Sequence, residues 1–296
     1  MTETVKGYAK INLHFDVRGI REDGYHSVNT VMQSISLCDD VSVTLTDGSD
    51  IVCECNKEGV PTDDKNIAVR AARLYFDSTR VKSGAIIKIN KNIPMAAGLA
   101  GGSADAAATL VALNRLFENK LDEAELCKLG ADLGADVPFC IACGTLFSDG
   151  RGDVLHSFPK LDGDVIFAVA CGGEGVSTPW GYRLLDEEFD SFKDYEPRSL
   201  DGIREAIGSG DALDFSKHLF NVFEAPVLMH RPVVKEVKDV FLSCGAENAL
   251  MSGSGPSVYA VFKDSADAQR AVDKILDMGY FGAIAKPVET RFAIYS

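Results

Sequence analysis

A glycine-rich stretch between residues 93 and 105 carries the clearest chemical signal in this sequence. It joins a segment that alternates like a strand, residues 87–90, to a segment with helical spacing, residues 106–117. Glycines let a backbone approach a ligand closely, and the first turn of a helix offers unpaired N–H groups at the positive end of its dipole. The stretch therefore predicts a phosphate-binding loop, with tight packing of the helix on a sheet as the alternative.

Two common phosphate-binding motifs do not describe this loop. No Lys-Ser or Lys-Thr pair follows its last glycine, as the Walker A motif requires. The glycines at positions 98, 101 and 102 also do not fit the dinucleotide-binding pattern G-x-G-x-x-G. The loop thus belongs to neither class.

Polar side chains alternate with apolar ones over residues 9–17, as in a half-buried strand. The polar set consists of Lys10, Asn12, His14 and Asp16. This row is either a solvated outer face or the lining of a cleft. In the second case Lys10 and Asn12 point into the cleft.

Two further sites could take part in chemistry. Asp23-Gly24 predicts a tight turn, after which Tyr25 and His26 could form a platform for a flat ring or simply lead out of the turn. Asp136 precedes Pro138 by two residues, a spacing typical of an N-cap for a short helix.

The remaining pattern predicts alternating strands and helices. We expect helices from a cap at Asn66 to residue 76, over 106–117 and 122–133, within 199–243 with breaks at Pro226 and Pro232, and over 265–278. Strands are expected over 9–17, as two segments within 28–46, over 87–90, as a hairpin within 144–153, over 165–170, 246–251 and 257–262, and within 281–295. Residues 47–65 and 175–182 are expected to be connections, and residues 251–256 form a second glycine loop.

The pattern restarts near residue 160, which predicts two α+β domains, residues 1–158 and 159–296. The last strand could pair back on the first sheet. At 296 residues the chain is long enough for two hydrophobic cores.

Composition and charge narrow the class of protein. A net charge of −14 argues against a nucleic-acid-binding surface. No signal peptide and no membrane-spanning run are evident, so we expect a cytoplasmic protein without a membrane partner. The eight cysteines lack the spacing of a disulfide scaffold or a zinc site, and we expect them to be small buried residues. A monomer and a homodimer are both compatible with the sequence.

Five stretches, in the same order as in the family, resemble the GHMP kinases. They are Ala9-Lys10-Ile11-Asn12-Leu13, Asp23-Gly24-Tyr25-His26, the loop from Gly98 to Ala107, Gly134-Ala135-Asp136-Val137-Pro138-Phe139, and Met251-Ser252-Gly253-Ser254-Gly255. The two glycine loops are typical of the whole superfamily. The Asp-Gly-Tyr-His and Gly-Ala-Asp-Val-Pro-Phe motifs are similar to those of members that phosphorylate a cytidine diphosphate alcohol.

This resemblance implies a ribosomal-S5-domain-2-like N-terminal domain and a ferredoxin-like C-terminal domain, with ATP and acceptor between them. Lys10 and Asp136 would be the catalytic pair, with Asp136 acting as a base or as an orienting anion. Residues implied for ATP are Asn66 near the adenine and Pro94, Ala96, Ala97, Gly98, Leu99, Ala100, Gly101, Gly102 and Ser103 near the phosphates, with Ser103 also a candidate Mg²⁺ ligand. Residues implied for the acceptor are Asn12, Tyr25, His26, Thr178 and Tyr182.

The chain departs from the family pattern at two places in the loop. Ala100 and Ala104 stand where the family usually has glycine and serine. Ala100 adds a Cβ in a tight loop, which affects the seat of the phosphates. Two alternatives remain open: another GHMP kinase, of the homoserine or mevalonate type, and a non-catalytic nucleotide-binding sensor.

Overall fold

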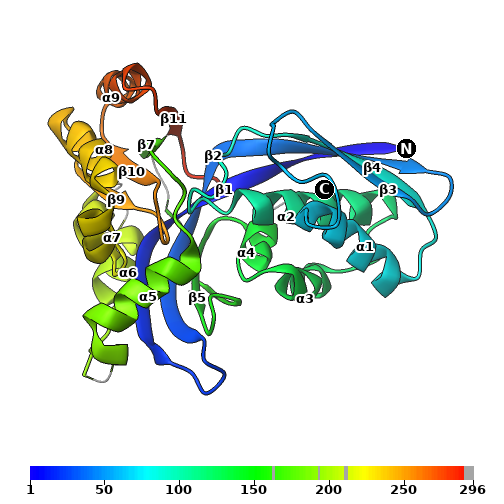
Figure 1. The fold of residues 1–296 in the computed structure, drawn as a ribbon, viewed down its shortest axis with the longest axis horizontal. Helices are drawn as coiled ribbons and strands as arrows, with labels where there is room; N and C mark the ends of the chain where they lie inside the picture. The colour runs from blue at the N-terminus through cyan, green and yellow to red at the C-terminus, as the bar shows by residue number, and fades with distance from the viewer. Residues whose placement is uncertain (162–163, 193, 210–212, 290–296) are drawn as a thin grey trace.

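Two β-sheets with helices packed against them make up this computed structural model, which describes residues 1–161, 164–192, 194–209 and 213–289. Figure 1 shows the larger sheet and helices α1–α4 on the right and the smaller sheet with α7–α9 on the left. The α+β class and the two-part architecture that the sequence predicts are therefore confirmed. The division at residue 158 stays a prediction.

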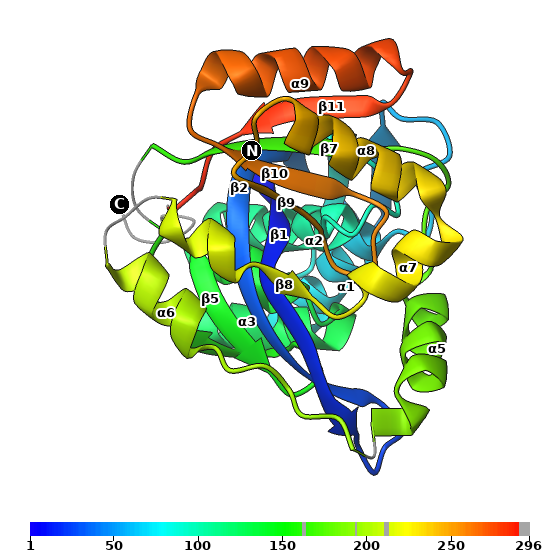
Figure 2. The same ribbon diagram turned by 90° about the vertical axis from the view of Figure 1, so that its left-hand side faces the viewer.

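The larger sheet is built on two long antiparallel strands, β1 and β2, that run along the molecule (Figure 2). Its strands are β1 (Thr2–Ile20), β2 (His26–Thr46), β3 (Ile51–Cys55), β4 (Gly84–Asn90), β5 (Thr145–Asp149), β6 (Val154–Ser157) and the short β8 (Phe220–Asn221). The order along the main path is β3-β4-β2-β1-β8, with the β5–β6 hairpin paired to β2. Helices α1 (Ile67–Thr79), α2 (Gly101–Leu116), α3 (Glu123–Leu133) and α4 (Val137–Ala142) pack together beside this sheet.

The smaller sheet has the order β11-β7-β10-β9 and is antiparallel throughout. Its strands are β7 (Ile166–Cys171), β9 (Asn248–Met251), β10 (Val258–Phe262) and β11 (Phe281–Ala285). The helices of this part are α5 (Thr178–Glu188), α6 (Asp201–Gly208), α7 (Glu224–His230), α8 (Pro232–Ser243) and α9 (Ser265–Asp277), with short 3₁₀ helices η1 (Asp190–Phe192) and η2 (Asp214–His218). Figure 2 shows α8 and α9 beside this sheet.

Helix starts follow the capping residues that the sequence offers. The Asn66 side chain accepts a hydrogen bond from the backbone N–H of Ala68 and begins α1. Asp122 and Glu125 form a reciprocal capping box that begins α3. These local signals explain why the predicted starts of both helices are confirmed.

The two parts are joined by strand pairing as well as by the chain. β8 lies parallel to β1, with Asn221 opposite Phe15. Near the end of the described chain, Val288 donates its N–H to the carbonyl oxygen of Ser34 in β2. Segments from the second half of the sequence therefore lie against both long strands of the first sheet.

Several sequence-based expectations are wrong in detail. Residues 28–46 do not form two strands, because β2 is one strand of 21 residues. Residues 47–65 contain β3, and residues 175–182 contain the start of α5 rather than a loop alone. The expected last strand ends at Ala285, and residues 290–295 of that prediction lie outside the described residues.

The polar row of β1 is not a solvated face. Lys10, Asn12, His14 and Asp16 are each at most 4% exposed. Asp16 accepts hydrogen bonds from the Tyr195 hydroxyl and the Arg198 backbone N–H, so a later segment covers this end of the row. The cleft interpretation holds for the other end, where Lys10 and Asn12 line a cavity.

Candidate active site

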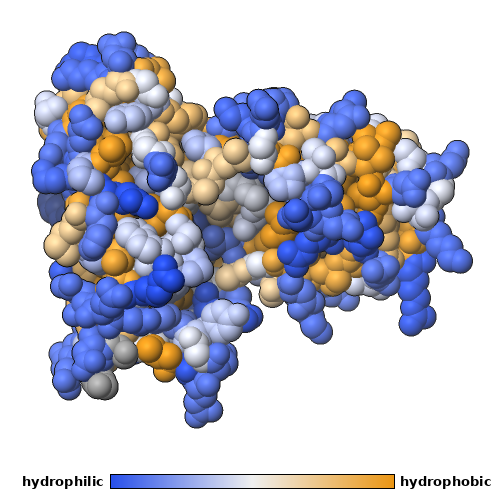
Figure 3. Space-filling view, in the orientation of Figure 1, coloured by the Kyte–Doolittle hydropathy of each residue, from blue (hydrophilic) through white to orange (hydrophobic). Residues whose placement is uncertain are grey.

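A cavity of about 1080 Å³ opens between the two parts of the molecule. Figure 3 shows this hollow at the centre of the face in view. It brings together residues that lie more than 240 positions apart in the sequence. The sequence-predicted site residues that line it are Lys10, Asn12, Tyr25, His26, Asn66, Pro94, Ala96, Ala97, Gly98, Ala100, Gly101, Gly102, Ser103, Asp136, Thr178 and Tyr182.

Leu99 is the exception among the predicted site residues. Its side chain is 1% exposed and belongs to the hydrophobic core. Its carbonyl oxygen accepts a hydrogen bond from the backbone N–H of Lys10. Leu99 therefore anchors the loop on β1 and does not line the cavity.

The backbone of the first glycine loop adopts a conformation that favours glycine at two positions where this chain has alanine. Ala96 and Ala100 have φ of 51° and 57°, in the left-handed region. Ala100 is the N-cap of α2 and makes no side-chain cap hydrogen bond, so the first N–H groups of α2 are left for another partner. This is the geometry of an anion site at a helix start.

The second glycine loop, residues 251–255, packs against the first loop backbone to backbone. The Ser252 hydroxyl donates to the carbonyl oxygen of Gly98 over 3.1 Å. A Cβ at Gly98 would overlap the carbonyl oxygen of Ser252, and Gly98 has φ +75°. Glycine is thus required at position 98 by both space and backbone conformation.

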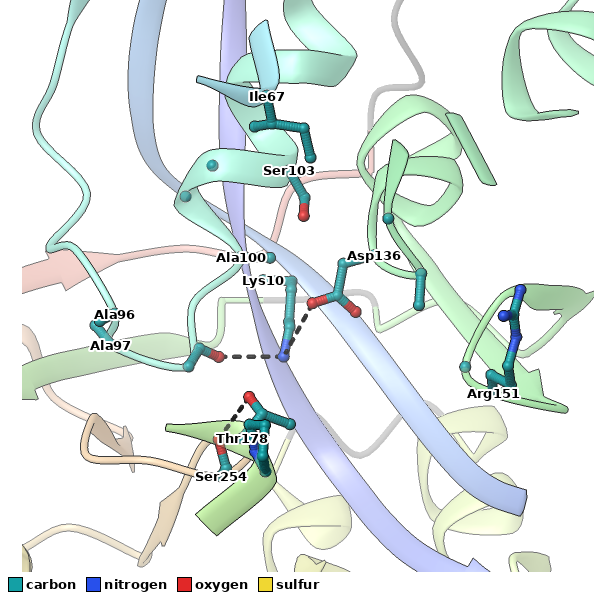
Figure 4. Close-up of a pocket in the computed structure, with 18 of the residues that line it drawn as sticks. Lys10, Ile67, Ala96, Ala97, Ala100, Ser103, Asp136, Arg151, Thr178 and Ser254 are labelled. Atoms are coloured by element: carbon teal, nitrogen blue, oxygen red, sulfur yellow. Dashed lines mark hydrogen bonds and ion pairs between the residues drawn. The ribbon is translucent and has the colours of Figure 1, made fainter. Parts of the chain in front are cut away.

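Lys10 lies where the two loops meet. Its ammonium donates to Asn12 Oδ1 over 2.7 Å and to the carbonyl oxygen of Gly98 over 3.1 Å. The same nitrogen is 4.0 Å from Asp136 Oδ2 (Figure 4). Because the side chain of Lys10 is only 5% exposed, β1 and the loop fix its ammonium at the cavity wall.

The Asp136 side chain faces the cavity. Asp136 is the N-cap residue of the short helix α4, as the spacing predicts, but its side chain makes no cap hydrogen bond there. The side chain is 37% exposed and its carboxylate points toward Lys10 (Figure 4). Ser103 in the first turn of α2 points into the same space.

Aromatic side chains gather at another end of the cavity. The rings of His26 and Tyr182 stack with centroids 4.3 Å apart, and His26 Nε2 is 2.7 Å from Asp186 Oδ1. Burial raises the pKa of the Tyr182 phenol well above its usual range, and the charge of Asp136 adds to this shift. Tyr25 is 59% exposed and turns its ring toward Arg151, whose guanidinium is 5.6 Å from the ring centroid.

The stacking of His26 on Tyr182 limits where a planar base could bind in the cavity. A ring does not fit between His26 and Tyr182, because they already touch each other. Tyr25 remains an exposed ring at the cavity mouth. A planar ligand at this end of the cavity would therefore have to stack outside the His26–Tyr182 pair.

Helix α5 explains why some site residues were missed. Thr178, Tyr182 and Asp186 are spaced by four residues and share one face of α5, which lines the cavity. Asp186 is not among the predicted residues because the sequence pattern of 175–182 indicates a loop. A Ser177 cap followed by Pro179 is the signal for this helix, and the structure confirms that cap.

Ser254 and Arg151 also line the cavity and were not predicted. The Ser254 hydroxyl is 3.3 Å from the Thr178 hydroxyl and links the second loop to α5 (Figure 4). Arg151 lies in the turn of the β5–β6 hairpin. Trp180, by contrast, packs on His230 and Arg231 of the α7 end and not in the cavity.

The Asn66 side chain is already used by the fold. Its Oδ1 caps α1, and its Nδ2 donates to the carbonyl oxygen of Pro61 over 2.7 Å. Asn66 therefore shapes the cavity wall through the cap and the preceding loop, next to Ile67.

The cysteines are free, as the sequence predicts, but not all are buried. Four of the eight are half-buried: Cys38, Cys55, Cys127 and Cys171. Among the described residues, no group of three or more His, Cys, Asp or Glu side chains is placed to hold a metal ion. In the same part of the chain, no helix combines the length and apolarity needed to cross a bilayer.

Comparison with known proteins places this geometry in a family. The sequence profile of the GHMP kinases N terminal domain matches residues 66–144, and that of the GHMP kinases C terminal domain matches residues 203–280. A protein of Acetivibrio thermocellus named 4-diphosphocytidyl-2-C-methyl-D-erythritol kinase is 42% identical over 266 residues, which cover 90% of this chain and 92% of that protein. A protein of the same name from Lachnoclostridium phytofermentans is 41% identical over 268 residues, 90% of each chain.

Solved structures agree with these relatives. A crystal structure of 4-(cytidine 5'-diphospho)-2C-methyl-D-erythritol kinase is 32% identical, covers 96% of this chain and 99% of its own, and superposes with a TM-score of 0.79. Homoserine kinase from Cytophaga hutchinsonii has a TM-score of 0.73 at 19% identity, with 97% of each chain covered, and shows the shared fold alone. The chain belongs to the GHMP kinase family and, within it, to the group of 4-diphosphocytidyl-2-C-methyl-D-erythritol kinases.

Proposed function

We propose that this chain transfers the γ-phosphoryl group of ATP to the 2-hydroxyl of 4-diphosphocytidyl-2-C-methyl-D-erythritol, in non-mevalonate isoprenoid precursor biosynthesis. The observation that carries the proposal is that one cavity holds a phosphate loop, a Lys10–Asp136 pair and an aromatic platform. A kinase for a cytidine diphosphate alcohol needs these three features to bind the ATP phosphates, to act on the acceptor hydroxyl and to bind the cytosine. Their presence in one cavity supports the proposal that the acceptor is a small molecule.

To catalyse phosphoryl transfer, a protein mainly has to position the two substrates and neutralise charge on the phosphates. The N–H groups at the start of α2 bind the ATP phosphates, and the Lys10 ammonium neutralises charge on the transferring group. Asp136 accepts or orients the proton of the acceptor hydroxyl. The catalytic roles of Lys10 and Asp136 are supported by their 4.0 Å separation at the cavity wall.

The acceptor's cytosine lies between Tyr25 and the His26–Tyr182 pair. Stacking on Tyr25 and Tyr182 gives affinity for any base, whereas His26, whose Nε2 already pairs with Asp186, can select among bases through Nδ1. Asn12, held between Lys10 and Thr30, orients the acceptor near the reacting hydroxyl. Thr178 shapes the same wall from α5.

The residues near the phosphate loop also fit Mg²⁺. Ser103 offers a hydroxyl oxygen that points into the cavity, and oxygen ligands are what Mg²⁺ prefers. Ser103 would hold the ion beside the ATP phosphates. Mg²⁺ bound there would supply further charge neutralisation for the phosphates.

The direct test is an assay of ATP consumption with 4-diphosphocytidyl-2-C-methyl-D-erythritol, with homoserine and mevalonate as parallel acceptors. We expect turnover with the cytidylyl acceptor and a kcat/KM at least a hundredfold lower for the other two. Turnover with homoserine or mevalonate at an equal kcat/KM would contradict the proposal and favour the corresponding GHMP kinase. ADP binding without turnover on any acceptor would favour the sensor alternative.

A further inference from the structure

A buried ionic cluster lies beneath the first glycine loop and takes no part in the proposed chemistry. Lys91 Nζ is 2.5 Å from Asp39 Oδ2 and 2.6 Å from Asp105 Oδ2. The side chains of all three residues are at most 5% exposed. Burying an ammonium group between two carboxyl groups is costly, and the attraction between them often does no more than offset that cost. Stability alone therefore does not explain the cluster.

The cluster connects the two ends of the loop. Asp39 Oδ1 accepts hydrogen bonds from the backbone N–H groups of Asn92 and Ile93, where the chain leaves β4 and enters the loop. Asp105 lies in the second turn of α2, where the loop has become a helix. Lys91 joins these two carboxylates, so the entry and the exit of the loop are tied by one ammonium group.

The fit around the Lys91 ammonium is close. A Cβ added at Gly101, the first residue of α2, would lie 3.0 Å from Lys91 Nζ. The start of the helix therefore rests directly on the ammonium. Lys91 and Asp105 also line the cavity, which places the cluster next to the nucleotide.

The loop needs such a constraint because its backbone is strained. Ala96 and Ala100 both have positive φ, and each costs about 1–2 kcal/mol in this region. Strained conformations persist only where the surrounding structure holds them in place. A clasp at both ends would keep the N–H groups at the start of α2 directed at the phosphates.

We propose that Lys91, Asp39 and Asp105 form an ionic clasp that positions the phosphate loop for ATP. They are positioning residues, because they act through the loop backbone and not on the reacting atoms. The proposal rests on the proposed function only in taking the nucleotide phosphates as the ligand of the loop. The link between Lys91 and Asp105 is the part that can be broken without leaving an unpaired buried charge.

Two substitutions of Asp105 form a matched pair. Asp105→Leu removes the link but leaves Lys91 paired with Asp39, so the charges stay balanced and the chain is expected to fold. Asp105→Asn keeps an oxygen that can accept from Lys91, and its amide nitrogen replaces Oδ1, which has no hydrogen-bond partner among the described residues. Both variants keep a side chain of nearly the same size.

The measurement is the Kd of MgADP by titration calorimetry, beside the KM values for ATP and for the cytidylyl acceptor. For Asp105→Leu we expect a Kd for MgADP and a KM for ATP at least tenfold higher, with the acceptor KM within twofold of the unmodified chain. Hydrogen exchange of residues 93–101 should accelerate in the same variant. For Asp105→Asn we expect a Kd within threefold of the unmodified chain.

A third variant separates positioning from general loss of stability. Tyr75→Phe removes a buried hydrogen bond to Asn114 between α1 and α2, remote from the loop. It should lower the unfolding free energy measured by urea denaturation and leave MgADP binding unchanged. An equal loss of MgADP affinity in Tyr75→Phe would show that stability, not the clasp, controls binding.

Other outcomes would also overturn the clasp. An unchanged Kd in Asp105→Leu would mean that the link does not position the loop. Equal losses in the Leu and Asn variants would mean that the carboxylate charge matters and the link does not. If the unmodified chain binds MgADP but fails to phosphorylate the cytidylyl acceptor, the proposed function is wrong and the clasp is still judged by the binding data.

Discussion

The Ser252 hydroxyl donates to the carbonyl oxygen of Gly98 over 3.1 Å and joins the two glycine loops beside Lys10. Lys10 donates to the same carbonyl oxygen. Ser257 adds a backbone hydrogen bond to the carbonyl oxygen of Ala97. The first glycine loop is thus fastened to the second part of the molecule at the wall of the cavity, next to Lys10.

Gly98→Ala should separate the two loops. A methyl group at this position would overlap the Ser252 carbonyl oxygen, and the φ of +75° disfavours alanine. We expect the unfolding free energy to fall by about 2 kcal/mol or more, measured by urea denaturation. Gly208→Ala is the control, because no atom of the described residues lies within 4 Å of a Cβ there, and it should change stability by no more than about 0.5 kcal/mol.

Asp136→Asn should impair the chemical step and spare the nucleotide. The substitution keeps the size of the side chain but removes the anion that faces Lys10 and that we propose accepts or orients the proton of the acceptor hydroxyl. We expect kcat to fall by about two orders of magnitude, with the Kd of MgADP nearly unchanged. Turnover equal to that of the unmodified chain would remove Asp136 from the mechanism.

Short-range sequence signals predict much of this site. The glycines around position 98 and the cap at Asn66 act within a few residues, so the loop and the start of α1 can be predicted from the sequence alone. Alternation along β1 predicts a polar row. It does not decide whether water or protein covers that row, because the covering residues Tyr195 and Arg198 are about 180 positions away.

Tyr25→Ala should weaken binding of the acceptor without affecting binding of ATP. Tyr25 is 59% exposed, so its removal costs the fold little, whereas Tyr182 also supports the rings of His26 and Phe223. Stacking of a base on one aromatic ring contributes about 1–3 kcal/mol to binding. Its loss should therefore raise the acceptor KM by about tenfold or more and leave the KM for ATP unchanged.

Trp180→Ala provides the matched control for this stacking surface. Trp180 is an aromatic residue of α5, but its ring packs on His230 and Arg231 outside the cavity. Its removal should leave the acceptor KM within twofold. An acceptor KM that stays constant in Tyr25→Ala would rule out stacking on this ring.

Ala100→Gly should make the chain more stable or leave it unchanged. Alanine at φ 57° costs about 1–2 kcal/mol, and glycine removes this cost while adding about 0.5–1 kcal/mol of unfolded-state entropy. The net expectation is a gain of between zero and about 1.5 kcal/mol in unfolding free energy. A loss above about 1 kcal/mol would show that the Ala100 methyl group contributes packing that outweighs its strain.

Contacts between distant segments explain what the sequence does not predict. Residues 39 and 91 belong to no motif and Asp105 lies at the end of one, yet β2, the end of β4 and α2 bring the three together in the buried cluster. The two-residue strand β8 pairs with β1 from about 200 positions away and has no periodicity to detect. Asp186 belongs to the site only because α5 begins before Tyr182 and carries its carboxylate to the cavity.

Asp105→Asn should change how stability depends on pH. Burial, with a smaller contribution from the charge of Asp39, raises the pKa of Asp105 from 3.8 to about 7, although Lys91 opposes the shift. Between these two values the folded chain binds a proton at Asp105 that the unfolded chain has released. The contribution of Asp105 to stability is therefore full below pH 4 and is lost as the pH rises toward 7.

Asparagine does not titrate, so the Asn variant lacks this loss. We expect the unfolding free energy of the variant, relative to the unmodified chain, to rise between pH 4.5 and pH 7 by at most about 1.4 kcal/mol per pH unit and then level off. Urea denaturation at pH 4.5, 6, 7 and 8 measures it, and the same series on Tyr75→Phe should give a constant difference. A difference for Asp105→Asn that does not change with pH would mean that Asp105 stays ionised beside Lys91 throughout this range.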